Sequence, residues 1–292
     1  MVVGKKRIGE KAFQVINIFI LLLFSVIILY PFMNIISISL SEVGSVMRGE
    51  VSFYPIGINF KAYIKIIQNS SILQAYLNTL IVVVGGTFFG VFLTAFAAYP
   101  LSKKIPGAVF ISFIIAITLW FDPGIIPRFL VVRNLQLYDK LYVLILVNLL
   151  SAYNIFVVRS FFSSIPVSLE ESALIEGCRE SGVLFRIVLP LSKPVLATIA
   201  LWIAVLHWNS FLDPLMYLRS RTNFTLQLIL RDIVIANNIQ DYGMVDDITA
   251  YSIANNSISY AAIISSILPV MALYPFLQKY FVKGVMIGAV KS

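Results

Sequence analysis

Long stretches without a single charged side chain constrain this sequence more than any other feature. A helix needs roughly 17 to 25 mostly apolar residues to cross a bilayer, and each stretch is long enough to supply them. Leu, Ile, Val and Phe run continuously through them instead of alternating with polar residues, which excludes the strands of a membrane β-barrel. The six stretches are residues 12–41, 66–102, 105–121, 141–158, 194–212 and 248–278.

Composition agrees with a helical membrane protein. Of the 292 residues, 59% are hydrophobic and only 12% are charged, and the mean hydropathy is +0.91. Charged residues make up about 25% of an ordinary globular chain. We therefore expect an all-α membrane protein with six transmembrane helices. The expected parts are an N-terminal tail (1–12), a first transmembrane helix (13–40), an outer loop (41–71), a transmembrane domain with helices two to six (72–278) and a C-terminal tail (279–292).

The first span has one property of a secretion signal, because Lys5, Lys6 and Arg7 precede an apolar run that begins at Phe13. Signal peptides have shorter apolar regions, of about 7 to 15 residues, followed by a cleavage site of small residues. We therefore expect this span to remain as the first helix. Basic residues are more frequent on the side of the membrane that holds the N-terminus, which predicts that both termini are cytoplasmic.

Several kinds of activity lack the residues that they need. The sequence has no G-x-x-x-x-G-K-[ST] phosphate-binding loop. Its one histidine, His207, and one cysteine, Cys178, cannot assemble a metal site or a disulfide. The net charge of +8 is explained by lysines beside the membrane, so nucleic acid is not expected as a partner. No catalytic residues and no cofactor are predicted for this chain.

A polar segment, residues 168–194, lies between the fourth and fifth apolar stretches. Ser168 and Glu171 have the spacing of a capping box, which predicts that a helix begins there. Gly177 is suited to a left-handed residue that ends this helix. A second short helix is expected from about Gly182 until Pro190 breaks it.

The second short helix carries one apolar face, formed by Leu184, Phe185, Val188 and Leu189. A simple connection between two helices needs only about 2 to 8 residues. The longer, structured segment therefore favours docking on a partner. A solvated connecting loop is the alternative.

The polar segment resembles the coupling loop of the membrane subunits of ATP-binding-cassette importers. The resemblance lies in Glu170-Glu171-Ser172-Ala173, Gly177, Ile187, Leu189, Pro190 and Pro194. The flanking FFSSIP, LPLSKPVLATIALW and YPFLQKYFVKGVMIGAVKS are similar to the smaller, six-helix permease subunit of the maltose-type, carbohydrate-uptake branch. The resemblance covers roughly residues 72–292. Ser172, Glu176 and Cys178 depart from it, since the family usually has Ala, Asp and Ala there.

The resemblance implies the type I importer permease fold, with a coupling loop (residues 166–194) that forms a cytoplasmic helix-turn-helix. In the family this loop is seated in a cleft of the ATP-hydrolysing subunit. Glu170 and Glu171 would contact basic groups on that subunit, and Gly177 would set the angle between the two short helices. The remaining coupling candidates, which would pack in the cleft or against the permease itself, are Ala173, Leu184, Phe185, Leu189 and Pro190. The tail from Lys283 to Ser292 resembles one that reaches the ATPase interface, and a free terminus is the alternative.

The resemblance also implies the partners. They are two copies of an ATPase subunit, which bind ATP and Mg, a second permease subunit that completes a heterodimer, an extracytoplasmic solute-binding protein and membrane lipid. The location would be the bacterial cytoplasmic (inner) membrane. The substrate would be a saccharide, expected to be an oligosaccharide, and the segment GIIPRFLVV is similar to a subgroup that handles uronate-containing ones.

Polar and aromatic residues inside the spans are the candidates for the translocation path, because such groups usually face the interior of a bundle. The six candidates are Asn78, Trp120, Asn148, Trp208, Asn209 and Asp213. Asn78 alternatively marks a helix start, Asp213 a cap and Trp208 an interfacial belt. An ion-driven secondary transporter is the alternative function, although it would normally need ionisable residues near the bilayer midplane. A membrane enzyme or sensor lacks the catalytic groups.

The expected helices differ in regularity. Helix two is expected from Leu73 to Tyr99, with Gly86 and Gly90 on a face that allows close packing. Helix three, 108–121, should break at Asp122-Pro123-Gly124. Helices four, five and six are expected at 141–158, 194–217 and 259–278.

Overall fold

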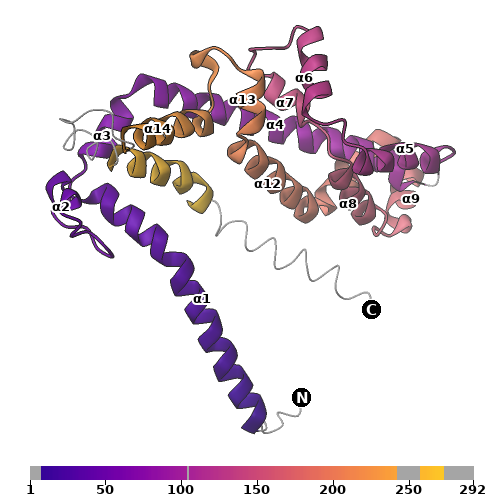
Figure 1. The fold of residues 1–292 in the computed structure, drawn as a ribbon. Helices are drawn as coiled ribbons and strands as arrows, with labels where there is room; N and C mark the ends of the chain where they lie inside the picture. The colour runs from indigo at the N-terminus through magenta and orange to yellow at the C-terminus, as the bar shows by residue number, and fades with distance from the viewer. Residues whose placement is uncertain (1–7, 104, 242–256, 273–292) are drawn as a thin grey trace. The chain divides into compact units, whose positions relative to one another are not determined.

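The computed structural model describes residues 8–103, 105–241 and 257–272 (Figure 1). Within these ranges the regular elements are helices. The chain divides into two compact units. The first holds Met1–Asn69 and Asp232–Ile267, and the second holds Ser70–Arg231 and Leu268–Ser292. Predictions for the C-terminal tail and for most of the N-terminal tail lie outside the described residues.

The first unit is built around the long helix α1, Ile8–Leu40, which contains an apolar stretch, Phe13–Leu40, long enough to cross a membrane. Two short helices, α2 (Val43–Met47) and α3 (Lys61–Gln68), follow it. The Tyr63 hydroxyl lies 2.8 Å from that of Ser39, and the Asn59 amide donates to the Leu40 carbonyl at 2.8 Å. These bonds fold the connection back onto the end of α1.

Helix α4, Ser70–Ser102, is the central element of the second unit and packs mainly against α12 and α8. Gly86 and Gly90 make this close approach possible. A Cβ added to Gly86 would lie 2.2 Å from Nε2 of His207, and one added to Gly90 would lie 3.0 Å from Cδ1 of Ile203. The predicted packing face is therefore confirmed, and it receives α12.

The helices of the second unit surround two apolar clusters. The larger cluster joins α4, α5, α8 and α12 with the coupling loop, and the smaller joins α4, α6, α7 and α13. The helices around these clusters are α5 (Ala108–Trp120), α6 (Ile125–Asn134), α7 (Val143–Val147), α8 (Ala152–Phe162), α12 (Lys193–Asn209) and α13 (Leu212–Tyr217). They are followed by the short 3-10 helix η2 (Arg221–Asn223) and by α14 (Leu226–Asp241), which continues into the first unit.

The predicted break after helix three is confirmed. Helices α5 and α6 are separated by Phe121 to Gly124 and bend by 115°. Gly124 has φ 78°, a left-handed value that glycine adopts without a steric cost, so it can turn the chain at this point.

Helices four and five are not continuous, contrary to the prediction. Helix four is split into α7 and α8, because Asn148 leaves the helix and Ser151 is extended, with φ −120° and ψ 127°. Helix five ends at Asn209 and resumes as α13. Pro214 accounts for the second break, since its ring clashes with the carbonyl four residues earlier and it donates no hydrogen bond.

Two described helices are long and apolar enough to cross a membrane, or four if each strongly bent pair forms one span. The bent pairs are Ala108–Trp120 with Ile125–Asn134 and Glu180–Leu191 with Lys193–Asn209. A shorter apolar helix, Ser257–Ala272, covers the described part of the expected sixth span.

Candidate functional site

The first helix of the coupling loop, α9, runs from Val167 to Ile175. The predicted capping box is wrong, because the N-cap of α9 is Pro166, two residues before Ser168. Ser168 lies inside the first turn, and no side chain caps the helix start. Pro166 has φ −58° and ψ 126°, so its fixed φ and extended ψ set the entry to the helix. The carbonyl of Ser168 instead accepts a hydrogen bond from the Ser172 hydroxyl at 2.8 Å.

Gly177 ends α9 as predicted, in a left-handed conformation with φ 84°. The Cys178 amide donates to the Ala173 carbonyl at 2.9 Å, and the Gly177 amide donates to the Leu174 carbonyl at 3.0 Å. This pair of bonds is the Schellman motif, which satisfies carbonyls left free at a helix end. The turn therefore has one defined geometry and fixes the direction of the second helix.

The second helix of the coupling loop begins before Gly182 and does not stop at Pro190, contrary to the prediction. It consists of α10 (Glu180–Val183), a π-helical turn η1 (Leu184–Val188) and α11 (Leu189–Leu191). A π turn widens the hydrogen-bond spacing. It ends two residues before Pro190, a residue that donates no hydrogen bond to a preceding carbonyl. Gly182 allows close packing, since a Cβ there would lie 2.5 Å from Sγ of Cys178.

The apolar residues of the coupling loop have two different environments. Leu184 and Val188 are buried in the larger cluster, and Ala173 and Leu189 pack against it. Phe185 is 51% exposed, and its ring lies edge-on to that of Phe96 with centroids 5.8 Å apart. The predicted single face therefore holds most of the loop against this chain and leaves Phe185 largely accessible.

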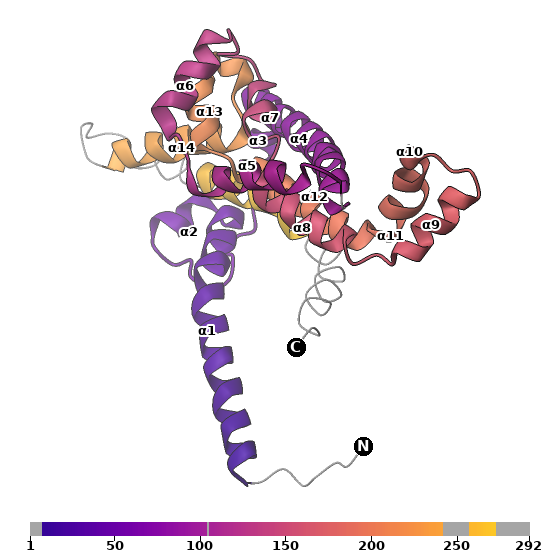
Figure 2. The same ribbon diagram turned by 90° about the vertical axis from the view of Figure 1, so that its right-hand side faces the viewer.

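The exposed surface of α9 combines charged and apolar side chains. Ile175 is 87% exposed, and Glu171 is also exposed. Figure 2 shows α9 and α10 side by side, connected by the turn that contains Gly177. Val167, Leu169 and Leu174 are also exposed on this helix, and a group of exposed apolar side chains, unlike a single one, is typical of a surface that contacts another protein.

Glu170 differs from Glu171, because it has a partner within the chain. Its carboxylate forms an ion pair with Lys103, at the end of α4, and the two side chains are 12% and 25% exposed. The Lys103 ammonium also lies 4.8 Å from the centroid of the Tyr99 ring. The ion pair holds α9 to the end of α4, and the contact with Tyr99, which is itself on α4, orients the Lys103 ammonium.

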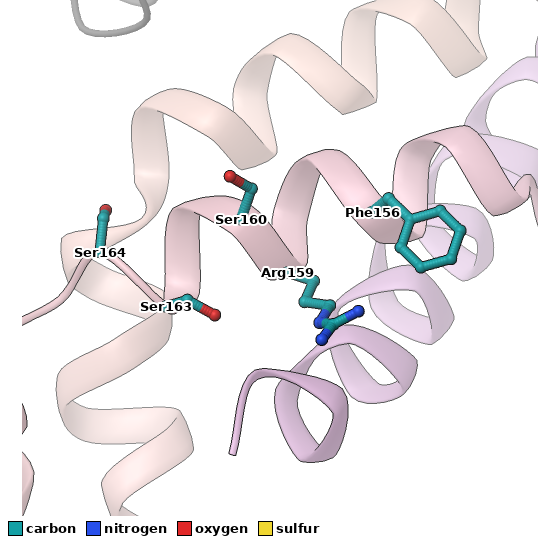
Figure 3. A pocket seen from close by; sticks show the side chains of 5 residues that line it. All are labelled: Phe156, Arg159, Ser160, Ser163 and Ser164. Carbon is teal, nitrogen blue, oxygen red and sulfur yellow. The ribbon is translucent and has the colours of Figure 1, made fainter. Parts of the chain in front are cut away.

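Helix α8, which leads into the coupling loop, is tied to α5 by Arg159. The guanidinium donates from Nη1 to the Ser112 hydroxyl at 3.1 Å. Figure 3 shows Arg159 extending from α8 at a hollow of about 420 Å³. The hollow is also lined by Phe156, Ser160, Ser163 and Ser164.

A larger cavity, of about 630 Å³, lies where α5, α6, α7, α8 and α12 meet at the breaks in the third and fourth spans. Its polar lining includes Asp122, Arg128, Asn148 and Asn154, and Trp202 contributes an aromatic ring. Non-helical backbone at membrane depth is tolerated only beside protein or a water-filled space. The two breaks therefore occur where the cavity gives them polar surroundings.

The structure brings together some of the translocation-path candidates. Nδ2 of Asn148 donates to Oδ2 of Asp213 at 2.7 Å, and Asn148 lines the cavity. Trp208 is buried, with its ring 6.4 Å from that of Tyr76, whereas the adjacent Asn209 is exposed. Trp120 is 85% exposed at the end of α5 and is not part of the cavity lining.

Asn78 has a structural function. Its amide donates to the carbonyls of Thr222 and Phe224 at 2.8 and 3.0 Å, and its Oδ1 accepts from Gln74 at 3.0 Å. These bonds fasten the segment around η2 to α4. All the hydrogen-bonding groups of this buried amide are engaged, two as donors and one as acceptor.

Six residues of these sites were not predicted from the sequence: Lys103, Arg128, Asn154, Arg159, Ile175 and Trp202. The break at Asp122-Pro123-Gly124 was a signal for the cavity, because Arg128 follows it within the next two turns of helix. No comparable signal marked Lys103, which is far from Glu170 in the sequence.

The chain is similar in sequence to known transport proteins. No protein-family model matches the chain. It is 37% identical to the polygalacturonan/rhamnogalacturonan transport system permease protein YtcP of Bacillus subtilis (strain 168), over 93% of this chain and 96% of the relative. It is 35% identical to the protein LplC of the same organism, over 97% and 96%. The arabinooligosaccharides transport system permease protein AraQ of Halalkalibacterium halodurans is 28% identical, over 91% of this chain and 92% of the relative.

A solved structure agrees with these relatives. The chain superposes on a chain from the crystal structure of a bacterial ABC transporter involved in the import of the acidic polysaccharide alginate. The TM-score is 0.87 at 32% identity, and the match covers 96% of this chain and all of the other. Such relatives are transport subunits and not enzymes, and ATP is hydrolysed by separate subunits of their complexes. The sequence identity to these relatives and the shared helical fold show that this chain belongs to the permease subunits of carbohydrate-uptake ATP-binding-cassette importers.

Proposed function

We propose that this chain forms one half of the translocation path of a binding-protein-dependent saccharide importer in a bacterial cytoplasmic membrane. A second permease subunit supplies the other half, two ATPase subunits bind ATP and Mg, and an extracytoplasmic binding protein delivers the substrate. The chain crosses the membrane six times, with both termini and the coupling loop in the cytoplasm. The parts are those expected from the sequence: tails 1–12 and 279–292, a first helix 13–40, an outer loop 41–71 and a transmembrane domain 72–278.

The surface of the coupling loop is the observation that carries this proposal. Buried Leu184 and Val188 hold the loop to the permease core, and the Schellman turn at Gly177 fixes its two helices. Glu171 and Ile175 remain accessible on α9. A rigid element of this kind transmits a displacement of the ATPase to α8 and α12, whereas a flexible connector would absorb it.

The coupling residues divide into two groups in this mechanism. Glu171, Ile175 and Phe185 contact the ATPase. Ala173, Leu184, Leu189 and Pro190 join the loop to the permease, and Glu170 keeps α9 attached to α4 through Lys103. Gly177 maintains the angle between the helices.

An acidic oligosaccharide is the substrate that we propose. The names of two relatives support this class, since one refers to polygalacturonan/rhamnogalacturonan and the other to the acidic polysaccharide alginate. The proposed translocation path includes Asn148, which lines the cavity, and its hydrogen-bond partner Asp213. Trp120 and Asn209, which are exposed, and Trp208, which is buried beside Tyr76, are the other proposed path residues. Asn78 supports the path indirectly through the segment around η2.

Site-specific crosslinking tests the coupling surface. Cys178 is the only cysteine, so a Cys178→Ala background permits a single new thiol at each position. In membranes that hold the whole complex, we expect Ile175→Cys to crosslink to the ATPase through a short bifunctional reagent. Ile126→Cys is the matched control, because this α6 isoleucine is 73% exposed but lies outside the coupling loop.

The crosslink should change with nucleotide state if the loop moves with the ATPase. Labelling with a membrane-impermeant thiol reagent should reach Ile175→Cys from the cytoplasmic side. The proposal is wrong if this thiol is labelled only from outside, or if the assembled complex yields no crosslink between α9 and the ATPase.

A further inference from the structure

We propose that the cavity at the breaks of the third and fourth spans is a carboxylate-reading subsite for the saccharide, with Arg128 as its specificity-determining residue. This inference rests on the proposed function and assigns part of the substrate contact to this subunit. The cavity has a volume of about 630 Å³, which lies within the range of roughly 300 to 1,000 Å³ for small-molecule sites.

Arg128 is the cation of the cavity lining, and it is held by a contact that a substrate can replace. Its Nη2 lies 3.1 Å from Oδ2 of Asp122, and the two side chains are 43% and 66% exposed. Ion pairs this accessible are weak, because water screens them. The contact engages one nitrogen of the guanidinium, so Nε and Nη1 are without a partner among the described residues. A uronate carboxylate can bind this fork through two parallel hydrogen bonds.

Asp122 is itself oriented by the break between α5 and α6. Its Oδ1 accepts a hydrogen bond from the Gly124 amide at 2.8 Å, and its Oδ2 accepts from Arg128. The left-handed Gly124 thus places the carboxylate where it occupies the guanidinium in the absence of substrate. Asp122 competes with a substrate carboxylate and excludes weak anions.

Neutral parts of a sugar would meet other groups in the cavity. The Asn154 amide lines it and makes no hydrogen bond to another described residue, whereas Asn148 is oriented by Asp213. Trp202 also lines the cavity, and its ring lies 5.6 Å from that of Tyr153, which is 55% exposed. An amide for hydroxyl groups beside an aromatic surface for the apolar face of a pyranose completes a saccharide site.

Lipid is a poor occupant of this cavity, because acyl chains would leave Arg128, Asp122 and Asn154 without polar partners. A helix of the second permease is the remaining competitor. If such a helix filled the cavity, binding of a saccharide would not depend on its carboxylates. Comparing a charged with an uncharged saccharide therefore distinguishes the two occupants.

Direct binding tests the subsite. The purified complex of this chain with its second permease and ATPase subunits is placed in nanodiscs without the binding protein. Trigalacturonate and its methyl ester are the probes, because esterification removes the charge of each carboxylate and adds only a methyl group. Ligand-observed NMR or calorimetry gives both affinities. We expect the acid to bind more tightly, and Arg128→Gln to remove this preference through a loss on the order of tenfold for the acid alone.

Two further variants control the experiment. Arg133→Gln removes an exposed arginine from the same helix, α6, outside the cavity, and should leave both affinities unchanged. Asp122→Asn removes the competing charge and should tighten binding of the acid. ATP hydrolysis by the same nanodiscs, stimulated by loaded binding protein, reports separately on the proposed function.

The inference is overturned if the complex hydrolyses ATP normally but binds neither probe or binds both alike. It is also overturned if Arg128→Gln keeps the preference or weakens both probes equally, which would indicate packing against the second permease. If no saccharide-stimulated hydrolysis occurs at all, the proposed function fails instead.

Discussion

Close packing of α4 on α12 predicts opposite effects for two adjacent glycines. A Cβ at Gly86 would lie 2.2 Å from Nε2 and 2.5 Å from Cδ2 of His207. The imidazole is 3% exposed and therefore has little room to move. A Cβ at Gly85 would meet only the terminal Cδ1 of Ile145, at 2.9 Å, and rotation of that side chain relieves the contact.

Two competing effects decide whether each variant is more or less stable than the original protein. Replacing a mid-helix glycine by alanine stabilises a helix by about 1 kcal/mol. Overpacking a well-filled interior costs about 1 to 3 kcal/mol. We expect Gly85→Ala to be neutral or stabilising. At Gly86 the 2.2 Å approach to a rigid ring puts the overpacking cost in the upper part of that range, about 2 to 3 kcal/mol. After the propensity gain is subtracted, Gly86→Ala should lose roughly 1 to 2 kcal/mol.

Thermal unfolding of the purified permease in detergent measures this difference. A loss of that size lowers Tm by roughly 2 to 8 °C for a chain of this length. Combining Gly86→Ala with His207→Ala should restore part of the loss, because the added methyl then occupies space left by the ring. Equal Tm values for the two glycine variants, or no rescue by His207→Ala, would refute the packing argument.

Two other predictions concern polar contacts outside the apolar core. Lys103→Glu and Glu170→Lys should each reduce coupling of ATP hydrolysis to transport, and the double variant should recover most of it, whereas Glu171→Lys should not be rescued by Lys103→Glu. Coupling is measured as ATP hydrolysed per saccharide transported. If Lys103→Glu restored coupling equally in the Glu170→Lys and Glu171→Lys variants, the assigned pairing would be contradicted. A hydrogen bond from the Ser220 hydroxyl, with further bonds from the Ser220 and Arg219 amides, lowers the pKa of Asp139 to about 2. Because the folded pKa is lower than the unfolded one, which is near 4, this contact stabilises the connection between Asp139 and the Arg219-Ser220 segment above about pH 5 and is lost as the pH falls towards 2. The protection of the Arg219 and Ser220 amides, which donate to Oδ1 of Asp139 at 2.9 Å, is measured as their hydrogen-exchange rate relative to the intrinsic rate at each pH, and it should fall over that range. In Asp139→Asn these amides should exchange faster at neutral pH, and unchanged exchange in the variant would show that the carboxylate does not hold the loop.

Sequence reasoning was most successful where one residue type has one conformational function. Gly177 and the break at Asp122-Pro123-Gly124 were predicted because glycine and proline restrict the backbone in known ways. Gly86 and Gly90 likewise predicted a packing face. Those inferences depended on local chemistry and needed no knowledge of the neighbouring helices.

Failures occurred where distant segments decide the conformation. Helix four was expected to be continuous, since Asn148, Ser151 and Asn154 are few polar interruptions in a long apolar run. The partner that fixes Asn148 is Asp213, 65 residues away. The capping box at Ser168 has the correct spacing, but Pro166 starts the helix earlier. The ion pair between Lys103 and Glu170 joins residues 67 apart, so nothing in either local sequence predicts it.

The bend at Ser192 relates a displacement of the coupling loop to a displacement at the far end of α12. The chain turns by 79° between Glu180–Leu191 and Lys193–Asn209, and Ser192, which separates them, is fully buried. At 1.5 Å per residue, the two arms are about 18 and 25 Å long. If Ser192 acts as a fixed fulcrum, a push on the short arm sweeps the far end of the long arm through about 1.4 times the distance. A small stroke at the loop would thus open a wider aperture at the opposite end of α12.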